Sequence, residues 1–285
     1  MDHHHEGLAA DLERLLETAT SRRQSLRWLL SGMAALPLAG CGGGASVGSV
    51  DASAAGSNAG TTGSTGGTSA SCAVIPEETG GPYPGDGTNS NGSGVANALT
   101  LAGINRSDIR TSVAPGSATA QGIPLTIRLQ LVNVSASCAS IAGAAVYLWH
   151  CDREGNYSMY ASGLTKENYL RGVQEADANG AVTFTTIFPG CYAGRMPHVH
   201  FEVFPTLAKA ASAAGRIKTS QFTFPMTTLN EVYADSTYAA SSRNLASMSY
   251  ATDNVFSDGT SLQMGVVSGN AGTGYTVTLV VGVSL

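Results

Sequence analysis

The sequence is poor in charged residues and has no long apolar run. Only 12% of its 285 residues are Asp, Glu, Lys or Arg, and the net charge is −5, so the cationic surface of a nucleic-acid-binding protein is missing. No apolar stretch reaches the ~18 residues that a membrane-spanning helix needs. Glycine occurs 35 times, and low charge with abundant Gly, Thr, Ser and Val favours strands and turns over helices. We therefore expect a β-rich protein without a nucleic-acid partner.

Histidine is scarce as well. Beyond residue 5 the chain has only His150, His198 and His200. The segment 198–204 has the alternation of a strand, so His198 and His200 are expected on the same side of a sheet. Two imidazoles on one face, preceded by a Tyr and an Arg, would form half of a metal site. A His-x-His pair is also common as two solvent-facing residues, so the pair alone does not decide between these interpretations.

The first 41 residues have the order of an export signal. A twin-arginine pair at 22–23 precedes an apolar run over 28–40, which ends in the sequence Leu-Ala-Gly-Cys at Cys41. This order resembles a bacterial twin-arginine signal with a lipobox, which would make Cys41 the lipidated first residue of the mature protein. A plain signal peptide with a chance cysteine is the alternative.

Two further parts follow Cys41. Residues 42–71 are almost entirely Gly, Ser, Ala and Thr, which cannot bury apolar surface, so they are expected to form a flexible tether. Residues 72–285 are expected to form one globular domain. The domain would then be held at the periplasmic or other extracytoplasmic face of a membrane through its lipid alone. Gly42 after the cysteine, in place of Asp, favours the outer membrane if the host has one.

Seven segments of this domain have β-branched and aromatic residues between turn signals, which predicts strands. They are 124–134, 143–150, 181–187, 198–204, 218–224, 261–267 and 275–283. The last two are expected to form a hairpin, and 228–234 and 241–247 are expected to form short helical turns. This succession predicts an all-β fold, an antiparallel β-sandwich with long loops and a few short helical turns.

Five motifs follow one another in the predicted domain. They are Glu-Glu-Thr-Gly-Gly-Pro-Tyr at 77–83, Trp-His-Cys-Asp with a following tyrosine at 149–157, Tyr-Leu-Arg-Gly at 169–172, Pro-Gly-Cys-Tyr at 189–192 and Arg-x-x-His-x-His at 195–200. In this order they resemble the intradiol ring-cleavage dioxygenases, and Trp-His-Cys-Asp is similar to the motif of their single-chain, exported branch. The resemblance runs from about Cys72 to the C-terminus.

The resemblance implies one ferric ion per chain, with Tyr157, Tyr192, His198 and His200 as its ligands. Two phenolates and two neutral imidazoles on Fe(III) leave one positive charge, which a hydroxide can neutralise. Hard, anionic tyrosinate oxygens stabilise the ferric state, and a ferric Lewis acid helps a catechol to lose both hydroxyl protons.

Other positions in the motifs imply further roles. Arg195 corresponds to the family's active-site arginine, whose charge stabilises the electron-rich ring, and Tyr192 to the tyrosinate that the catechol displaces. Gln221 and Tyr83 are expected next to the ligands or the substrate. Gly194 stands where some protocatechuate enzymes have a bulky aromatic residue, so we expect a pocket that is more open or filled differently. Taken singly, each of these residues is also explained by an ordinary strand, turn or surface position.

The implied function is insertion of both atoms of O2 into a catechol-type aromatic diol, giving a cis,cis-muconate-type diacid. The alternative is an exported β-sandwich that binds a metal or an iron–catecholate complex without turnover, and such a protein would not need Arg195. A zinc or copper enzyme built on His198 and His200 has only His150 as a further histidine ligand. The sequence does not determine which ring substituents the protein accepts or whether it forms oligomers.

Four cysteines follow Cys41, and an even number in an exported domain suggests two disulfides, for which three pairings exist. A thiolate metal site is less favoured, because no Cys-x-x-Cys spacing occurs. Cys151 and Cys191 each lie close in sequence to a proposed ligand, so we expect a bridge that joins the two ligand-bearing loops. Cys72 and Cys138 would form the other bridge.

Overall fold

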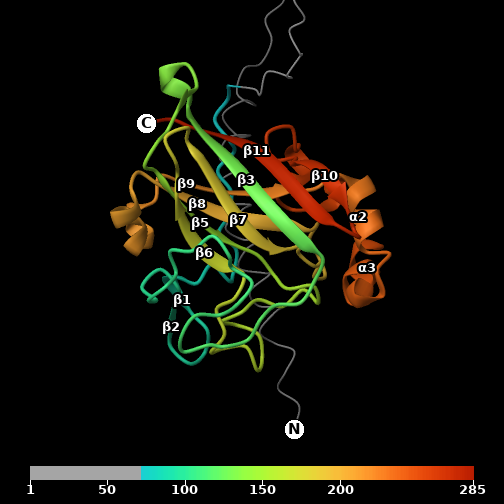
Figure 1. Cartoon of the computed structure of the whole chain (residues 1–285). Coiled ribbons are helices and arrows are strands. Elements are labelled where there is room, and N and C mark those ends of the chain that lie inside the picture. Colours follow the sequence, from blue (N-terminus) through green and yellow to red (C-terminus); the bar gives the residue numbers. More distant parts are fainter. Residues whose placement is uncertain (1–71) are drawn as a thin grey trace, which may run out of the picture. The chain divides into compact units, whose positions relative to one another are not determined.

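The computed structural model describes residues 72–285 (Figure 1). The predicted signal, lipid anchor and tether lie in residues 1–71, outside this part. In the described part, no helix has the length and apolar character needed to cross a membrane.

The first of two large sheets is built around β3, Pro124–Asn133. On one side β3 pairs in parallel with β11, Gly274–Val283, which forms an antiparallel hairpin with β10, Val266–Asn270. On its other side β3 pairs antiparallel with β7, Ala181–Ile187, and near its end with β4, Ala139–Ser140. The predicted sandwich therefore contains one parallel strand pair among antiparallel ones.

The second sheet is entirely antiparallel and has the order β6-β5-β8-β9. Its strands are β6 at Arg171–Glu175, β5 at Ala145–Trp149, β8 at His198–Phe204 and β9 at Lys218–Thr223. The two sheets lie face to face, and a small ribbon of β1, Asp86–Ser90, and β2, Val95–Asn97, lies below the second sheet in the view of Figure 1. The predicted β-sandwich is confirmed.

Helices are short and connect the strands. Within residues 72–285 the α-helices are α2, Met226–Val232, and α3, Ala239–Leu245, which agree with the two predicted helical turns. The 3-10 turns are η1 at Val134–Ala136, η2 at Leu207–Ala211, η3 at Ala213–Gly215, η4 at Ser236–Tyr238, η5 at Tyr250–Thr252 and η6 at Phe256–Asp258.

Six of the seven predicted strands are confirmed, one begins later than predicted, and the four strands β1, β2, β4 and β6 were not predicted. The strand predicted over 261–267 begins only at Val266, because the chain before it turns, with Gln263 N–H donating to the Thr260 carbonyl. Strand β6 was not predicted, because its Arg-Gly-Val-Gln-Glu sequence has low strand propensity. A close approach explains its glycine: a Cβ on Gly172 would meet Cγ2 of Ile109 at 2.5 Å.

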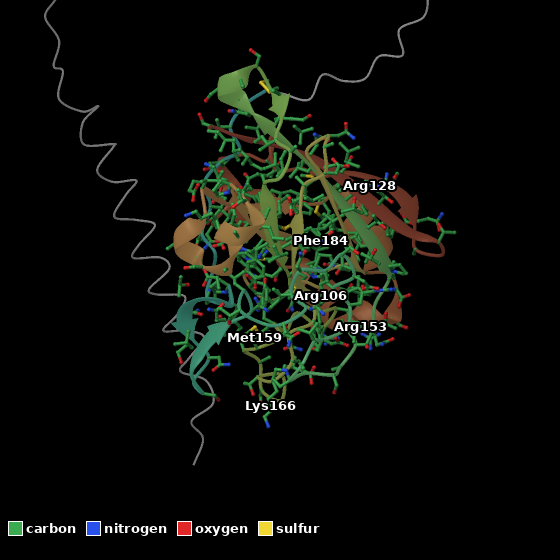
Figure 2. The ribbon with its side chains drawn as sticks, turned by 60° about the vertical axis from the view of Figure 1, so that its left-hand side comes forward. Arg106, Arg128, Arg153, Met159, Lys166 and Phe184 are labelled. Atoms are coloured by element: carbon green, nitrogen blue, oxygen red, sulfur yellow. A yellow bond between two sulfur atoms is a disulfide. The ribbon has the colours of Figure 1, made fainter. Side chains whose placement is uncertain are left out.

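The main core lies between the sheets. Leu129 of β3 and Phe184 of β7 pack with Leu148 of β5 and Phe201 of β8, and Figure 2 shows Phe184 among the packed side chains. The opposite face of the second sheet is also covered, and there Tyr147 belongs to a second buried cluster. Both faces of β8 are buried as a result.

The cysteines form one of the two expected bridges. Cys72 is disulfide-bonded to Cys138, as predicted. Cys151 and Cys191 are free and buried, so the predicted bridge between them is wrong. Each thiol lies against a backbone carbonyl, with Cys151 Sγ 3.5 Å from the Gly190 oxygen. The two loops are joined by the backbone instead, because Gly190 N–H donates to the Asp152 carbonyl at 3.0 Å.

Candidate metal centre

The alternation of β8 brings its two histidines together on the outer face of the second sheet. His198 and His200 are each only 2% exposed, which excludes the interpretation as solvent-facing residues. Their Nε2 atoms lie 3.0 Å apart. The intervening Val199 points into the main core, as the period of two requires.

Neighbouring groups fix the orientation of both imidazoles. His198 Nδ1 lies 2.6 Å from the Met196 carbonyl, so Nδ1 donates the proton and Nε2 keeps its lone pair for a metal. His200 stacks on Trp149, with ring centroids 4.9 Å apart and an interplanar angle of 3°. The ring of Trp149 therefore limits the positions that the His200 ring can adopt.

Two loops bring tyrosines to this pair. Tyr157 comes from the loop between β5 and β6, and Tyr192 from the loop between β7 and β8. Their hydroxyls lie 3.5 and 3.4 Å from His198 Nε2. A Cβ on Gly155 would lie 3.2 Å from the Tyr192 Cβ, so glycine at 155 lets the two loops approach. All four predicted ligand groups thus converge within reach of one ion, and ligation itself stays a prediction.

The charge state of the four groups follows from their burial. Burial raises the pKa of Tyr157 well above its ordinary value and that of Tyr192 to about 12. Burial, followed by nearby positive charge, lowers the pKa of His198 and of His200. At neutral pH the imidazoles are therefore neutral, as metal ligation requires. The phenols are protonated at this pH and would ionise only on a bound metal cation. This donor set suits a hard, highly charged ion.

Arg195 lies beside the tyrosines and is held from two sides. Its Nε donates to Asp253 Oδ2 at 2.9 Å, and its Nη2 donates to Gln221 Oε1 at 2.7 Å. Burial lowers the pKa of Arg195, but attraction to Tyr192 and to Asp253 outweighs it and raises the pKa overall. A fixed positive charge is therefore present at the candidate centre.

The two further predicted residues also lie here. Gln221 is fully buried, and its Nε2 donates to the Thr79 carbonyl at 2.7 Å, so both ends of its amide are bonded within the protein and it positions Arg195. The ring of Tyr83 lies 5.0 Å from that of Tyr157. Gly194 is exposed, and a Cβ there would have no atom within 4 Å.

The third histidine of the domain is engaged elsewhere. His150 Nε2 lies 2.7 Å from the Thr186 hydroxyl, and its Nδ1 lies 2.8 Å from the Cys151 carbonyl. Among residues 72–285, no group of three or more His, Cys, Asp and Glu side chains could hold a metal ion. His150 is therefore bonded away from the pair His198 and His200.

Sequence reasoning missed two residues of the centre. Asp253 is fully buried and pairs with Arg195 from 58 residues away in sequence, and no local motif marks it. Trp149 is fully buried, and its stacking on His200 follows from the strand register that aligns these two residues. Its alternation with Leu148 could have placed it on the outer face, but the register could not be predicted.

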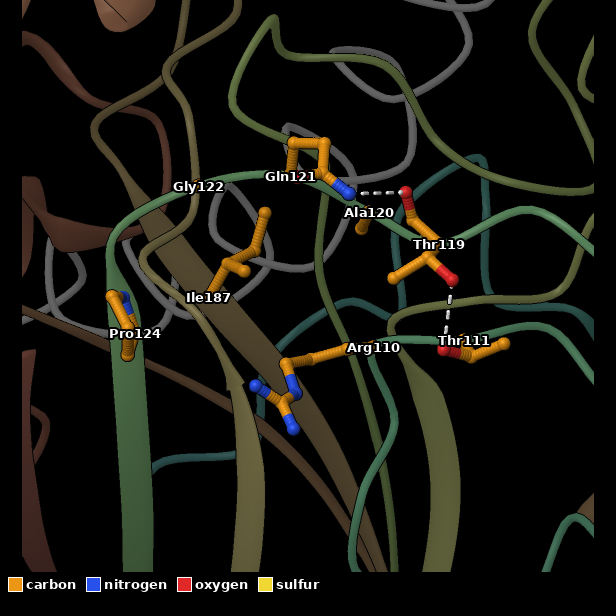
Figure 3. Close-up of a pocket in the computed structure, with 8 residues that line it drawn as sticks. All are labelled: Arg110, Thr111, Thr119, Ala120, Gln121, Gly122, Pro124 and Ile187. Carbon is orange, nitrogen blue, oxygen red and sulfur yellow. Dashed lines mark hydrogen bonds between the residues drawn. The ribbon is translucent and has the colours of Figure 1, made fainter.

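A separate cavity of about 300 Å³ contains none of these residues. It is lined by Arg110, Thr111, Thr119, Ala120, Gln121, Gly122, Pro124 and Ile187 (Figure 3). Arg110 is already paired with Asp108 at 2.6 Å. The converging tyrosines and histidines, and not this cavity, therefore mark the candidate centre.

Known proteins share this fold and sequence pattern. Residues 105–257 match the family model described as Dioxygenase. An intradiol ring-cleavage dioxygenase from Tetranychus urticae is 25% identical, and the superposition covers 75% of this chain and 95% of that one with a TM-score of 0.56. A second dioxygenase crystal structure has 26% identity, the same coverages of 75% and 95%, and a TM-score of 0.55. A 3-chlorocatechol 1,2-dioxygenase from Rhodococcus opacus 1CP has 17% identity, coverages of 73% and 71%, and a TM-score of 0.46.

Proposed function

Because this chain belongs to the intradiol ring-cleavage dioxygenase family, we propose that it uses non-haem Fe(III) to insert both atoms of O2 into a catechol-type diol. The product would be a cis,cis-muconate-type diacid. One observation supports this most: two phenol oxygens and an imidazole nitrogen lie within 3.5 Å of His198 Nε2.

The donor set fits the ferric ion that such chemistry needs. Tyr157, Tyr192, His198 and His200 would hold it, with two anionic oxygens to balance its charge. When bound, Fe(III) would supply the Lewis acidity that favours loss of both catechol protons.

The two tyrosines would have different roles. Tyr157 is 3% exposed, whereas Tyr192 is only half-buried, so Tyr192 has more room to move away when a diol binds. A phenol whose pKa is about 12 is a strong base once ionised. We therefore assign Tyr192 to the uptake of one substrate proton.

Arg195 would act on the substrate by its charge. An arginine stays protonated, and its bonds to Asp253 and Gln221 fix it before a substrate arrives. Such a fixed cation stabilises negative charge that develops on a bound diol without any reorganisation.

The proposal is tested on the purified full-length protein. We expect bound iron, a visible tyrosinate-to-iron absorption band, oxygen uptake with a panel of catechols, and ring-opened diacid products. Tyr157→Phe and His200→Ala should lose both the band and the iron. Tyr160→Phe is the matched control, because the Tyr160 hydroxyl bonds to Asn89 and Gly85. Iron and full activity in Tyr157→Phe would reject the ligand assignment.

Turnover separates an enzyme from a binding protein. If the protein binds iron and catechol but consumes no oxygen with any diol of the panel, the binding function is correct. Arg195→Gln should retain iron and lose most turnover, since it removes charge from the substrate side and no ligand.

We also propose that the domain is exported by a twin-arginine signal and anchored through lipid on Cys41. The order of the signal and the Leu-Ala-Gly-Cys sequence support this proposal. The anchor would place the activity at the extracytoplasmic side of a membrane.

A further inference from the structure

The segment Thr79–Pro84, which we call the roof segment, crosses over the candidate centre. A Cβ on Gly81 would lie 3.2 Å from Cε1 and 3.6 Å from Nε2 of His200, so the backbone passes directly over this imidazole. The φ of Gly81 is +70°, a conformation that glycine adopts without strain. The ring of Tyr83 packs against Tyr157. The roof segment thus touches two of the four proposed ligands.

The roof segment is held from beneath by one cross-strand row of side chains. Strand register aligns Arg171 with Trp149, Trp149 with His200, and His200 with Gln221. Gln221, at one end of the row, donates to the Thr79 carbonyl at 2.7 Å. His200 and its stacking partner lie between the two ends, so the row supports the imidazole as well as the segment above it.

Arg171, at the other end of the row, joins the roof segment to the loop that carries Tyr157. Its Nη2 donates to the Tyr83 carbonyl at 3.0 Å, and its Nη1 donates to the Pro84 carbonyl at 2.7 Å. On the other side, Nη2 and Nε donate to the Ser158 carbonyl and hydroxyl at 2.9 and 3.1 Å. One guanidinium therefore fixes the separation of the two segments.

Arg171 is a buried cation with many hydrogen bonds, which distinguishes it from a residue that contributes only packing. Its side chain is fully buried, and it forms no ion pair within residues 72–285. A further bond goes to the Tyr147 hydroxyl at 3.1 Å. Burying a cation without a carboxylate costs free energy that a well-packed apolar residue avoids. Five donors in a rigid plane, which only arginine has, satisfy acceptors on both segments at once.

We propose that Arg171 is a positioning residue that sets how closely Tyr83 approaches Tyr157, and thereby limits the size of ring substituent that the centre admits. The substrate consequence rests on the proposed dioxygenase function, whereas the clamp between the two segments does not. The two parts can therefore fail separately.

Hydrogen exchange tests the clamp without any turnover. In full-length Arg171→Lys, amides of residues 79–85 should exchange roughly tenfold faster than in the unchanged protein, because lysine cannot bond both segments at once. Arg106→Lys is the matched control: Arg106 donates to the carbonyls of Asn168 and Arg171 and to none in the roof segment. Unchanged exchange of 79–85 in Arg171→Lys would overturn the proposal.

A milder variant keeps the test usable if Arg171→Lys does not fold. Ser158→Ala removes one hydroxyl acceptor of Arg171 and leaves the buried charge in place. It should also speed exchange of residues 79–85, by a smaller factor. Exchange that stays at the level of the unchanged protein in this variant would again contradict the clamp.

A double-mutant cycle tests the effect on substrates. Arg171→Lys should raise KM severalfold for a bulky substituted catechol, with a smaller change in kcat. In a Tyr83→Ala background the same substitution should change KM less than about twofold, because its effect passes through the Tyr83 ring. If the effects of the two substitutions on KM were additive, Arg171 would act on the fold in general and not through Tyr83, and the proposal would be overturned. If no catechol is turned over, the dioxygenase function fails, and the exchange experiment still decides the clamp.

Discussion

Replacing Asp253 by asparagine should destabilise the protein far more than the size of the change suggests. The carboxylate is fully buried and accepts four hydrogen bonds. Oδ2 accepts from Arg195 Nε at 2.9 Å and Met196 N–H at 2.7 Å, and Oδ1 accepts from Val255 N–H at 2.8 Å and Phe256 N–H at 3.0 Å. Asparagine has one acceptor oxygen, so its amide NH2 would face two of these donors.

The magnitude follows from the burial of the ion pair. The side chains of Arg195 and Asp253 are 8% and 0% exposed, so water screens their attraction little. Removing one partner of a buried pair costs about 3–5 kcal/mol, because the other charge stays buried without compensation. For a domain of roughly 200 residues each kcal/mol lowers Tm by about 2–4 °C, so a fall of roughly 6–20 °C is expected.

Thermal and urea unfolding of the full-length protein measure this effect. Asp108→Asn is the matched control, because Asp108 also pairs with an arginine, Arg110, but the two side chains are 51% and 41% exposed. Such an exposed pair contributes less than about 1 kcal/mol. Equal losses of stability in the two variants would show that burial of the pair does not decide its contribution.

The remaining predictions concern pH, the disulfide and the anchor. Burial raises the pKa of Glu202 from 4.5 to about 8, so the folded state binds the proton more tightly and stability should fall by roughly 3–5 kcal/mol as pH rises from about 4.5 to about 8. Urea unfolding across this range should show the free energy of unfolding falling as pH rises. Glu202→Gln should remove most of this fall, whereas Glu175→Gln, the control at an exposed position, should leave it unchanged. Replacing both Cys72 and Cys138 by serine opens a bridge with a sequence separation of 66 and should cost about 4 kcal/mol, and an unchanged Tm would contradict this. Cys41→Ser should move the protein from the membrane fraction to the soluble fraction, and a variant that stays in the membrane fraction would reject the lipobox.

Local patterns were sufficient for six of the strands and for the direction of the two histidines. The period of two in 198–204 placed His198 and His200 on one face, and the structure has their Nε2 atoms 3.0 Å apart. Turn signals between the last two predicted strands also predicted the antiparallel pairing of β10 with β11. These features depend on residues that are neighbours in the chain, and a sequence displays such relations directly.

Relations between distant segments could not be predicted. The parallel pairing of β11 with β3 joins residues about 150 positions apart, such as Tyr275 and Leu125, and no local pattern specifies it. The prediction of a second disulfide, between Cys151 and Cys191, was wrong for a related reason. Cys151 and Cys191 do lie on adjoining loops, but the bond between Gly190 and Asp152 already joins these loops, and sequence does not reveal which contact holds them.

The location of the candidate centre follows from the two-faced burial of β8. One face of the strand must be apolar, because Val199, Phe201 and their neighbours fill the space between the sheets. Polar ligands can then lie only on the outer face, where the strand alone would leave them in water. Loops and the roof segment cover that face, so most of the buried polar groups there need partners within the protein, although Trp149 Nε1 and His200 Nδ1 have none among the described residues. Asp253 accepts a hydrogen bond from Arg195, and Arg171 donates hydrogen bonds to the carbonyls of the roof segment. For this reason we expect Asp253, which lies far from any motif, to affect the centre as strongly as residues inside one.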